Sequence, residues 1–319
     1  MSVNRKKTKA QKIILSIIFV YRKMNTKFRT IPVILSCFFL INIYANQDTT
    51  KHWKLKSIFS LNGTQSSFVN WNAGGRNNAS FIGSIRANAY YTDSKWKLAN
   101  DLHLSFGAIK YLDNLPASFQ KTDDKIDFST SGEFKFFKKL SLSLFSGLKT
   151  QMIHGYVYPN DTVIVSSFMA PGYLNLALGI DFSPKENLSI FTSFLSEKST
   201  FVLNDYLSKL GVFGVEKGKK SRQEYGAYVK VKYNMNLMRN IEMRAKLELF
   251  SNYLVNPQNI DVNGELIFNF KINSLFSALA QWNLIYDDDV KIRDAKGNSG
   301  PRTQFKSVLG IGISYKIEN

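Results

Sequence analysis

The segment Lys125-Ile-Asp-Phe-Ser-Thr-Ser-Gly-Glu-Phe-Lys-Phe-Phe137 decides the fold. Alternate positions from Ile126 to Phe136 are mostly apolar, whereas those from Lys125 to Lys135 are charged or carry a hydroxyl group. Because successive side chains of a β-strand point to opposite faces, the segment is predicted to be a strand with one apolar and one polar face. The period alone leaves open which face meets water.

The same alternation recurs in twelve segments of the chain. They lie at 53–64, 79–91, 95–109, 123–137, 140–152, 173–183, 186–195, 222–234, 239–252, 259–272, 275–287 and 303–317. Strands of soluble proteins average about five or six residues, whereas strands that cross a membrane need about nine to eleven. Nearly all twelve segments are in the longer class, which favours a sheet that crosses a membrane.

The connections between these segments alternate between long and short. The short ones are 92–94, 138–139, 184–185, 236–237 and 273–274, and the long ones include 110–122, 153–172, 196–221 and 288–302. Bacterial outer-membrane barrels have short periplasmic turns and longer extracellular loops. The sequence therefore predicts an all-β fold, a single antiparallel up-and-down transmembrane β-barrel of about twelve strands. The alternative, a large soluble β domain with its apolar face inside, explains neither the strand lengths nor the sorting of the loops.

In such a barrel the apolar face meets lipid and the polar face lines the lumen. Candidate selectivity residues are the charges predicted to point inward: Lys97, Asp127, Glu133, Lys135, Lys230, Lys232, Glu242, Arg244, Lys246 and Glu248. Both signs are present. These side chains either pair across strands and close the lumen, or line a narrow aqueous path.

The N-terminal region is predicted to be an export signal. Residues 24–29 are basic, 31–43 are apolar, and Ala45 is small enough for cleavage, so 24–45 is predicted to be a signal peptide and 46–319 the outer-membrane barrel domain. Residues 1–23 are interpreted as a mis-called extension before a true start at Met24, or as an unusually long start of the signal. Cys37, the sole cysteine, lies inside this signal, which excludes disulfides and cysteine catalysis from the exported chain.

The charge balance does not point to nucleic acid. The formal net charge is +18. Much of it comes from the N-terminal 45 residues, which hold many Lys and Arg and no acidic residue. No basic helix or base-stacking motif is evident, so nucleic acid is not a predicted partner. The predicted partners are the lipid bilayer and small polar solutes, while protein partners are left open.

Several motifs resemble one known family. They are Trp71-Asn72-Ala-Gly74-Gly75, Asp123-Asp124 within 121–126, 168–173, 259–263 around Asp261, and 286–288. Together they resemble the domain of unknown function 3078 family, exported proteins interpreted as envelope β-barrels, over the whole mature chain. The family has no assigned activity, so the resemblance implies membership and no chemistry.

Clustered carboxylates stand where outer loops meet strands. Asp123 and Asp124, and the run Asp287 to Asp289, could hold a hard cation such as calcium. More often such carboxylates are solvated turn residues or partners of nearby basic residues, here Lys121, Lys125, Lys291 and Arg293. Because no spaced ligand loop is present, no metal and no cofactor is predicted.

The connection 201–220 is the most apolar of the outer loops. Tyr206, Leu207 and Leu210 have helical spacing between Asn204, a possible N-cap, and Gly211, a possible stop. This pattern predicts a short helix at the barrel mouth. It is either a structural element or a gate over the lumen.

Three functions follow from these patterns. The first is a passive channel or narrow transporter for small polar solutes. The second is a non-conducting structural or assembly barrel that presents loops to partners. The third is a membrane-embedded hydrolase using His103 and Ser105, which lie two apart on one strand face. That face is predicted to be the lumen, which a bilayer lipid cannot reach, so the protein is not predicted to be an enzyme.

Overall fold

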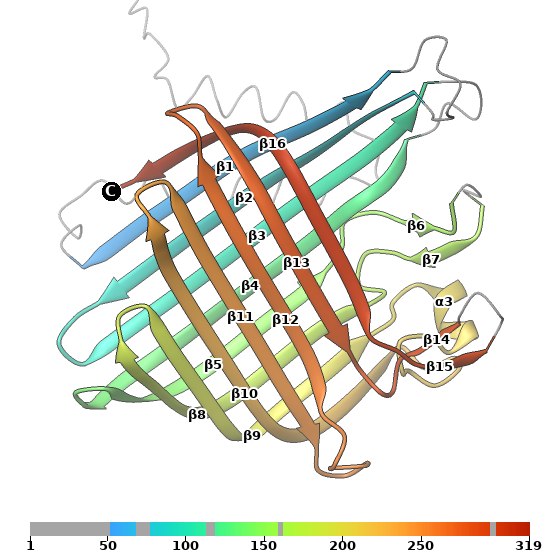
Figure 1. Ribbon diagram of the computed structural model, residues 1–319. Helices are drawn as coiled ribbons and strands as arrows, with labels where there is room; N and C mark the ends of the chain where they lie inside the picture. Colours follow the sequence, from blue (N-terminus) through green and yellow to red (C-terminus); the bar gives the residue numbers. More distant parts are fainter. Residues whose placement is uncertain (1–51, 68–76, 113–118, 159–161, 294–297) are drawn as a thin grey trace, which may run out of the picture. The chain divides into compact units, whose positions relative to one another are not determined.

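A computed structural model describes residues 52–67, 77–112, 119–158, 162–293 and 298–319. Lys54–Asn319 forms one compact unit, a closed antiparallel barrel of twelve strands (Figure 1). This confirms the predicted fold. The predicted signal at 24–45, the extension at 1–23 and the motif residues Trp71, Asn72, Gly74 and Gly75 lie outside the described residues.

The barrel strands follow one another in chain order. They are β1 (Trp53–Ser66), β2 (Asn78–Thr92), β3 (Trp96–Tyr111), β4 (Gln120–Phe137), β5 (Leu140–Thr150), β8 (Gly172–Lys185), β9 (Leu188–Phe201), β10 (Ser221–Met238), β11 (Ile241–Asn252), β12 (Asp261–Lys271), β13 (Phe276–Tyr286) and β16 (Gln304–Glu318). β1 and β16 close the barrel, in a register that runs from Lys56 opposite Glu318 to Gly63 opposite Ile311. Closure leaves no sheet edge with unpaired backbone groups.

The long and short connections are sorted to opposite ends of the barrel. The smaller elements all belong to long connections: β6 (Gly155–Tyr156), β7 (Ile164–Ser166), α3 (Asp205–Leu210), β14 (Lys291–Arg293) and β15 (Ser299–Pro301) (Figure 1). We call this the long-loop end and the other the short-turn end. No helix in the described part of the chain is both long and apolar enough to span a membrane.

Two predicted short turns are displaced by a few residues. Pro184 and Lys185 belong to β8, so the turn falls at 186–187, and β10 continues through Met238, so the next turn falls at 239–240. The pairing of β8 with β9 is irregular between Phe182 and Lys185. Such an irregularity accommodates Pro184, which has no backbone N–H to donate. The strand therefore passes the proline that seemed to end it in the sequence.

The two faces of the barrel have the polarity expected from the alternation. Large apolar side chains are exposed on the outside, including Phe194 at 78% and Leu309 at 70%. Charged side chains are buried inside, including Glu133 at 5% and Glu248 at 7%. A polar interior and an apolar outer surface are what a barrel in lipid requires.

A β-bulge in β9 corrects the predicted end of that strand. The pairing with β10 shifts between Tyr228 opposite Ser193 and Gly226 opposite Ser196, so Phe194 and Leu195 both face outward. The Ser193 hydroxyl donates to Leu178 O at 2.7 Å and accepts from Leu195 N at 3.1 Å. Two successive apolar residues break the alternation, which is why the sequence pattern stops at residue 195 although β9 continues to Phe201.

Candidate functional site

The lumen contains two chambers stacked along the barrel. The inner chamber has a volume of about 310 Å³ and lies toward the short-turn end, between residues such as Lys56, Tyr90 and Arg244. The outer chamber has a volume of about 600 Å³ and lies toward the long-loop end, between residues such as Asp123 and Asp287. Both volumes are within or close to the range of small-molecule sites.

A layer of ion pairs separates the two chambers. We call it the ion-pair layer, and it consists of Lys125, Asp127, Lys149, Lys246, Glu248 and Glu265. Lys246 Nζ lies 3.0 Å from Asp127 Oδ2, and Lys125 Nζ lies 2.8 Å from Glu265 Oε1. Lys149 pairs with Glu248, whose other carboxylate oxygen accepts a 3.0 Å hydrogen bond from the Tyr228 hydroxyl. Five of the six, all but Lys125, line both chambers, and the layer is therefore their common boundary.

These ion pairs cross the lumen rather than run along its wall. Lys125 on β4 and Glu265 on β12 belong to strands at opposite positions in the barrel order. Lys246 on β11 also reaches β4 from a distant strand. Side chains that meet from opposite walls constrict a lumen much more than side chains paired on neighbouring strands.

The inner chamber is lined by more cations than carboxylates. The basic residues are Lys56, Arg86, Lys149, Lys230, Lys232, Arg244 and Lys246, and the acidic ones are Asp101, Asp127, Glu242, Glu248 and Glu265. Every one of these carboxylates is engaged in an ion pair. The pairs are Lys232–Asp101, Lys246–Asp127, Arg244–Glu242, Lys149–Glu248 and Lys125–Glu265.

The remaining predicted lumen charges lie near the short-turn end. Lys97 Nζ contacts both carboxylate oxygens of Glu133, at 3.1 and 3.0 Å, and Lys135 Nζ donates to Asp93 O at 3.0 Å. None of these three predicted residues lines either chamber. The structure therefore brings seven of the ten predicted residues together around the inner chamber and leaves Lys97, Glu133 and Lys135 apart from it.

An aromatic cluster inside the barrel was not anticipated from the sequence. Phe145, Phe191, Tyr228 and Phe250 are buried together with Ala177. Phe145 stacks on Tyr228, with 5.7 Å between ring centroids and 9° between planes. On β5 the other inward positions are small or polar, such as Ser141 and Ser143. Phe145 at an inward position was therefore the sequence feature that could have indicated the cluster.

Arg86, Lys198 and Lys306 are lumen cations that the sequence analysis missed. Lys198 follows the β-bulge of β9, where the alternation changes phase, and its inward direction could not be read from the preceding residues. Lys306 pairs with Asp123 across the outer chamber. Arg86 interrupts a run of small and apolar residues on β2. A single arginine in such a strand was the sequence feature that could have indicated an inward-facing cation.

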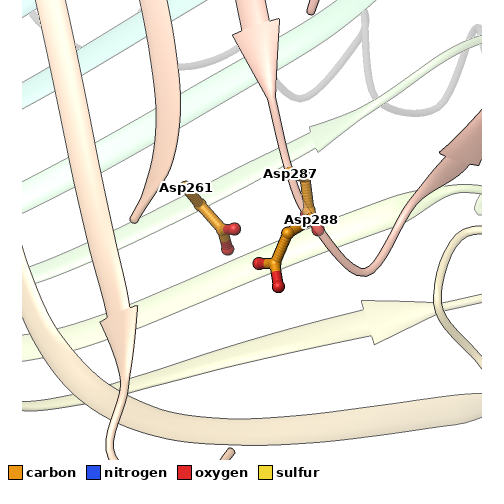
Figure 2. Close-up of side chains that lie close together, drawn as sticks. All are labelled: Asp261, Asp287 and Asp288. Carbon is orange, nitrogen blue, oxygen red and sulfur yellow. The ribbon is translucent and has the colours of Figure 1, made fainter. Parts of the chain in front are cut away.

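Three carboxylates gather at the long-loop end around a lysine. Asp261, at the start of β12, lies close to Asp287 and Asp288, which follow β13, and Figure 2 shows the side chains converging. Lys198 Nζ lies 2.5 Å from Asp261 Oδ2 and 2.8 Å from Asp287 Oδ2. An ammonium group is therefore already paired with two of the three carboxylates, which weakens the case for a divalent cation there.

Asp123 and Asp124 have structural partners. Asp123 accepts hydrogen bonds from the Ser105 hydroxyl and from Lys306. Asp124 accepts from the backbone N–H groups of Met152 and Ile153, at 2.7 and 3.0 Å, and pairs with Lys121. The two carboxylates thus fix the start of β4 against β3 and the chain after β5.

The His103 and Ser105 side chains do not form a nucleophile pair. Ser105 donates to Asp123, and His103 Nδ1 is buried without a hydrogen-bond partner among the described residues. A serine nucleophile needs an adjacent base in hydrogen-bond contact. Both residues are in the polar interior, so the geometry gives no support to lipid hydrolysis at this pair.

The connection after β9 folds as predicted, into a short capped helix. Asn204 accepts from Leu207 N at 3.1 Å and Gly211 ends α3 in the left-handed conformation, at a φ of 68°. Leu207 is 1% exposed and packs with Ala170, Val202 and Val215. The partly buried side chains of Ile164, Val212 and Phe213 pack against this apolar cluster.

Two further contacts hold this connection. Lys220 Nζ pairs with Asp205 Oδ1 at 2.8 Å, and this hydrogen bond, followed by the charge of Lys220, lowers the pKa of the Asp205 carboxyl. Phe213 joins the apolar cluster and also lines the outer chamber. Tyr206 and Leu210 are half exposed. The loop is therefore a packed element at the rim of the outer chamber.

Solved structures similar to this chain are barrels of low sequence identity. The COG4313 outer membrane channel from Pseudomonas putida F1 is 12% identical, covers 83% of this chain and 96% of its own, and has a TM-score of 0.38. The NanC porin is 6% identical, with 80% and 98% covered and a TM-score of 0.36. The translocator domain of autotransporter NalP from Neisseria meningitidis is 9% identical, with 87% and 92% covered and a TM-score of 0.31.

No curated protein matches the sequence. A family match covers one part of the barrel, from the end of β1 to β6, and includes Asp123 and Asp124. Asp261 lies outside the matched segment, and its motif stays a prediction. Residues 64–156 match the family described as "Protein of unknown function (DUF3078)", which confirms the predicted resemblance for this segment, while its extent over the rest of the mature chain stays a prediction.

Proposed function

We propose that the protein is an outer-membrane channel for small polar solutes, with the ion-pair layer as its narrowest point. In this proposal the long-loop end is extracellular and the short-turn end is periplasmic, as in bacterial outer-membrane barrels. The arrangement of two chambers on either side of a charged layer carries the proposal. Water-filled spaces lined by fixed charges are what a selective path needs.

The same layer limits what can pass. Lys246 and Asp127 meet at 3.0 Å, and Lys125 and Glu265 meet at 2.8 Å, so these side chains hold the centre of the lumen together. A solute can pass only when its polar groups replace the contacts between the paired side chains. The proposed channel is therefore narrow and suited to small solutes, in contrast to an open general pore.

Conductance of the purified protein in planar bilayers tests the proposal. We expect small unitary currents from the wild type and larger ones from the double variant Asp127→Asn/Lys246→Met, because neither side chain then has an opposite charge to hold across the lumen. Lys316→Met is the matched control, since Lys316 pairs with Glu318 at the end of β16, where both side chains are half exposed. It should conduct as the wild type does.

A non-conducting structural barrel is the second candidate, and the cross-lumen ion pairs favour it. It predicts no current from the wild type, and none from the double variant either. A barrel that stays silent in both, while inserting into the bilayer normally, contradicts the channel proposal.

The loop containing α3 is the proposed gate, through Tyr206, Leu207 and Leu210, and deleting 203–219 should raise the open probability if it covers the outer chamber.

A further inference from the structure

We propose that the inner chamber binds the oxyanion group of a small solute, a carboxylate or a phosphate, between Arg86 and Lys230 and beside His103. The biological role of this site rests on the proposed channel function, and the site would define the class of solute. Binding itself is a property of the chamber. It can therefore be measured apart from transport.

The first support is the charge that remains after pairing. All five carboxylates of the inner chamber are held by lysine or arginine partners, and Lys56 shares Glu242 with Arg244 at a distance of 3.7 Å. The chamber cations that remain are Arg86 and Lys230. Within the described residues, neither side chain forms a hydrogen bond or an ion pair to a carboxylate. The chamber thus has two surplus fixed cations.

Arg86 interacts electrostatically with three carboxylates, and each of them already has another cation partner. Asp127 pairs with Lys246, and Glu242 pairs with Arg244. Glu265 is close enough to interact with Arg86 electrostatically. Its carboxylate, however, accepts from Lys125 at 2.8 Å, Gln281 at 3.3 Å and Asn283 at 3.2 Å. The five N–H donors of the guanidinium remain for another acceptor, and their fork geometry fits a carboxylate or a phosphate.

Lys230 has aromatic neighbours, and the carboxylate of its register partner Glu248 is held by Lys149 and Tyr228. Its Nζ atom lies 3.3 Å from the centroid of Phe145 and 5.6 Å from that of Phe191, and the residue is 6% exposed. Ring faces attract a cation and compensate part of its lost hydration. They accept no conventional hydrogen bond, so a buried ammonium at this position still gains from an anion.

The placement of these groups on facing walls of one chamber forms a single site. Arg86 on β2 is the register partner of His103 on β3, so the two side chains are neighbours on one wall. Lys230 on β10 stands six strands away in the barrel order, on the opposite wall, and lines the same chamber. An anion between them would be held from both sides of the lumen.

His103 supplies the second, independent observation. It is 8% exposed, lines the chamber, and its Nδ1 atom is buried without a partner among the described residues. A buried polar atom without a partner is costly, and one that carries a proton would donate to an oxyanion. At about 310 Å³ the chamber is at the lower limit of known ligand sites, which favours a small solute.

The test is calorimetric titration of the full-length protein in detergent with sodium acetate and, separately, sodium phosphate at fixed ionic strength. The wild type should bind at least one of them saturably. Arg86→Gln and Lys230→Met should each weaken that binding by about tenfold, the loss expected for one charge-assisted contact. Arg86→Lys, which keeps the charge and loses the fork, should lie between Arg86→Gln and the wild type.

Lys138→Met is the matched control, because it removes a lysine from the exposed turn between β4 and β5. Its affinity should equal that of the wild type, and the heat-dependent migration of each variant on gels reports its folding. Saturable binding of acetate alone assigns a carboxylate, and of phosphate alone a phosphate group. No saturable binding by the wild type, or unchanged affinity in the folded Arg86→Gln/Lys230→Met variant, overturns the inference.

The outcome separates this site from the channel proposal. Anion binding without any bilayer current overturns the proposed function and leaves the site. Current without anion binding overturns the site and leaves the channel.

Discussion

Lys246 Nζ on β11 lies 3.0 Å from Asp127 Oδ2 on β4, across the lumen of the barrel. Asp127 has a second cation, Lys125, at 3.4 Å, whereas Asp127 is the sole ion-pair partner found for Lys246 in the described part of the chain. The two partners are therefore not equivalent. Removing the carboxylate leaves the partly buried ammonium group of Lys246 without an ion pair, whereas removing the lysine leaves Asp127 paired with Lys125.

This asymmetry predicts unequal effects of the two single substitutions. Asp127→Asn should lower the free energy of unfolding by about 3–5 kcal/mol, the cost of leaving one member of a buried pair alone. Lys246→Met should cost clearly less, and the double variant less than the sum of both. Urea unfolding in lipid vesicles measures all three. Lys316→Met, in an exposed pair, should cost at most about 1 kcal/mol. Equal losses for the two single variants would contradict the assigned pairing.

The α3 loop should open independently of the barrel. Leu207→Ala removes the largest buried side chain of its apolar cluster, so the loop should become sensitive to limited proteolysis while the folded barrel persists on gels. Leu210→Ala is the matched control, because Leu210 is 47% exposed on the same helix. Cleavage at the same rate in both variants would show that the cluster does not hold the loop.

Lys198 should control whether the carboxylates at the long-loop end bind a cation. We expect Lys198→Met to lose stability, because Asp261, Asp287 and Glu224 then have no ammonium among them. Millimolar calcium should restore part of that loss, and the wild type should respond much less, which thermal unfolding with and without calcium would measure. Adding Asp261→Asn to Lys198→Met should remove the calcium effect. A calcium response as large in the wild type would argue against the lysine as the resident cation.

Gly179 should be required opposite the bulge of β9. A Cβ atom at this position would overlap the carbonyl oxygen of Thr192, so Gly179→Ala should force the backbone to shift and cost about 1–3 kcal/mol or prevent folding. Gly264→Ala is the control, since its Cβ would meet Leu284 at an ordinary 3.8 Å. The yield of heat-modifiable, folded protein measures the difference. Normal folding of Gly179→Ala would mean that β8 and β9 are not so closely packed there.

The sequence alone was sufficient for the strand count, for the direction of side chains such as Asp127 and Phe136, and for the capped helix after Asn204. These features depend on residues close together in the chain, because the β period, a cap and a turn are local. Prediction ended where the local pattern was interrupted. The bulge at Phe194 and Leu195 concealed the rest of β9 and, with it, the inward direction of Lys198.

Which charges meet across the lumen was decided by the tertiary structure. Lys125 and Glu265 are distant in the chain, and only the closure of the barrel and the register of each strand bring them within 2.8 Å. The same closure determines that Arg86 and Lys230 remain without carboxylate partners. Alternation in the sequence established that this protein has an apolar outside and a charged inside. The cross-lumen geometry alone established which of the charges in the described residues form ion pairs, because electrostatic pairing depends on distance in space.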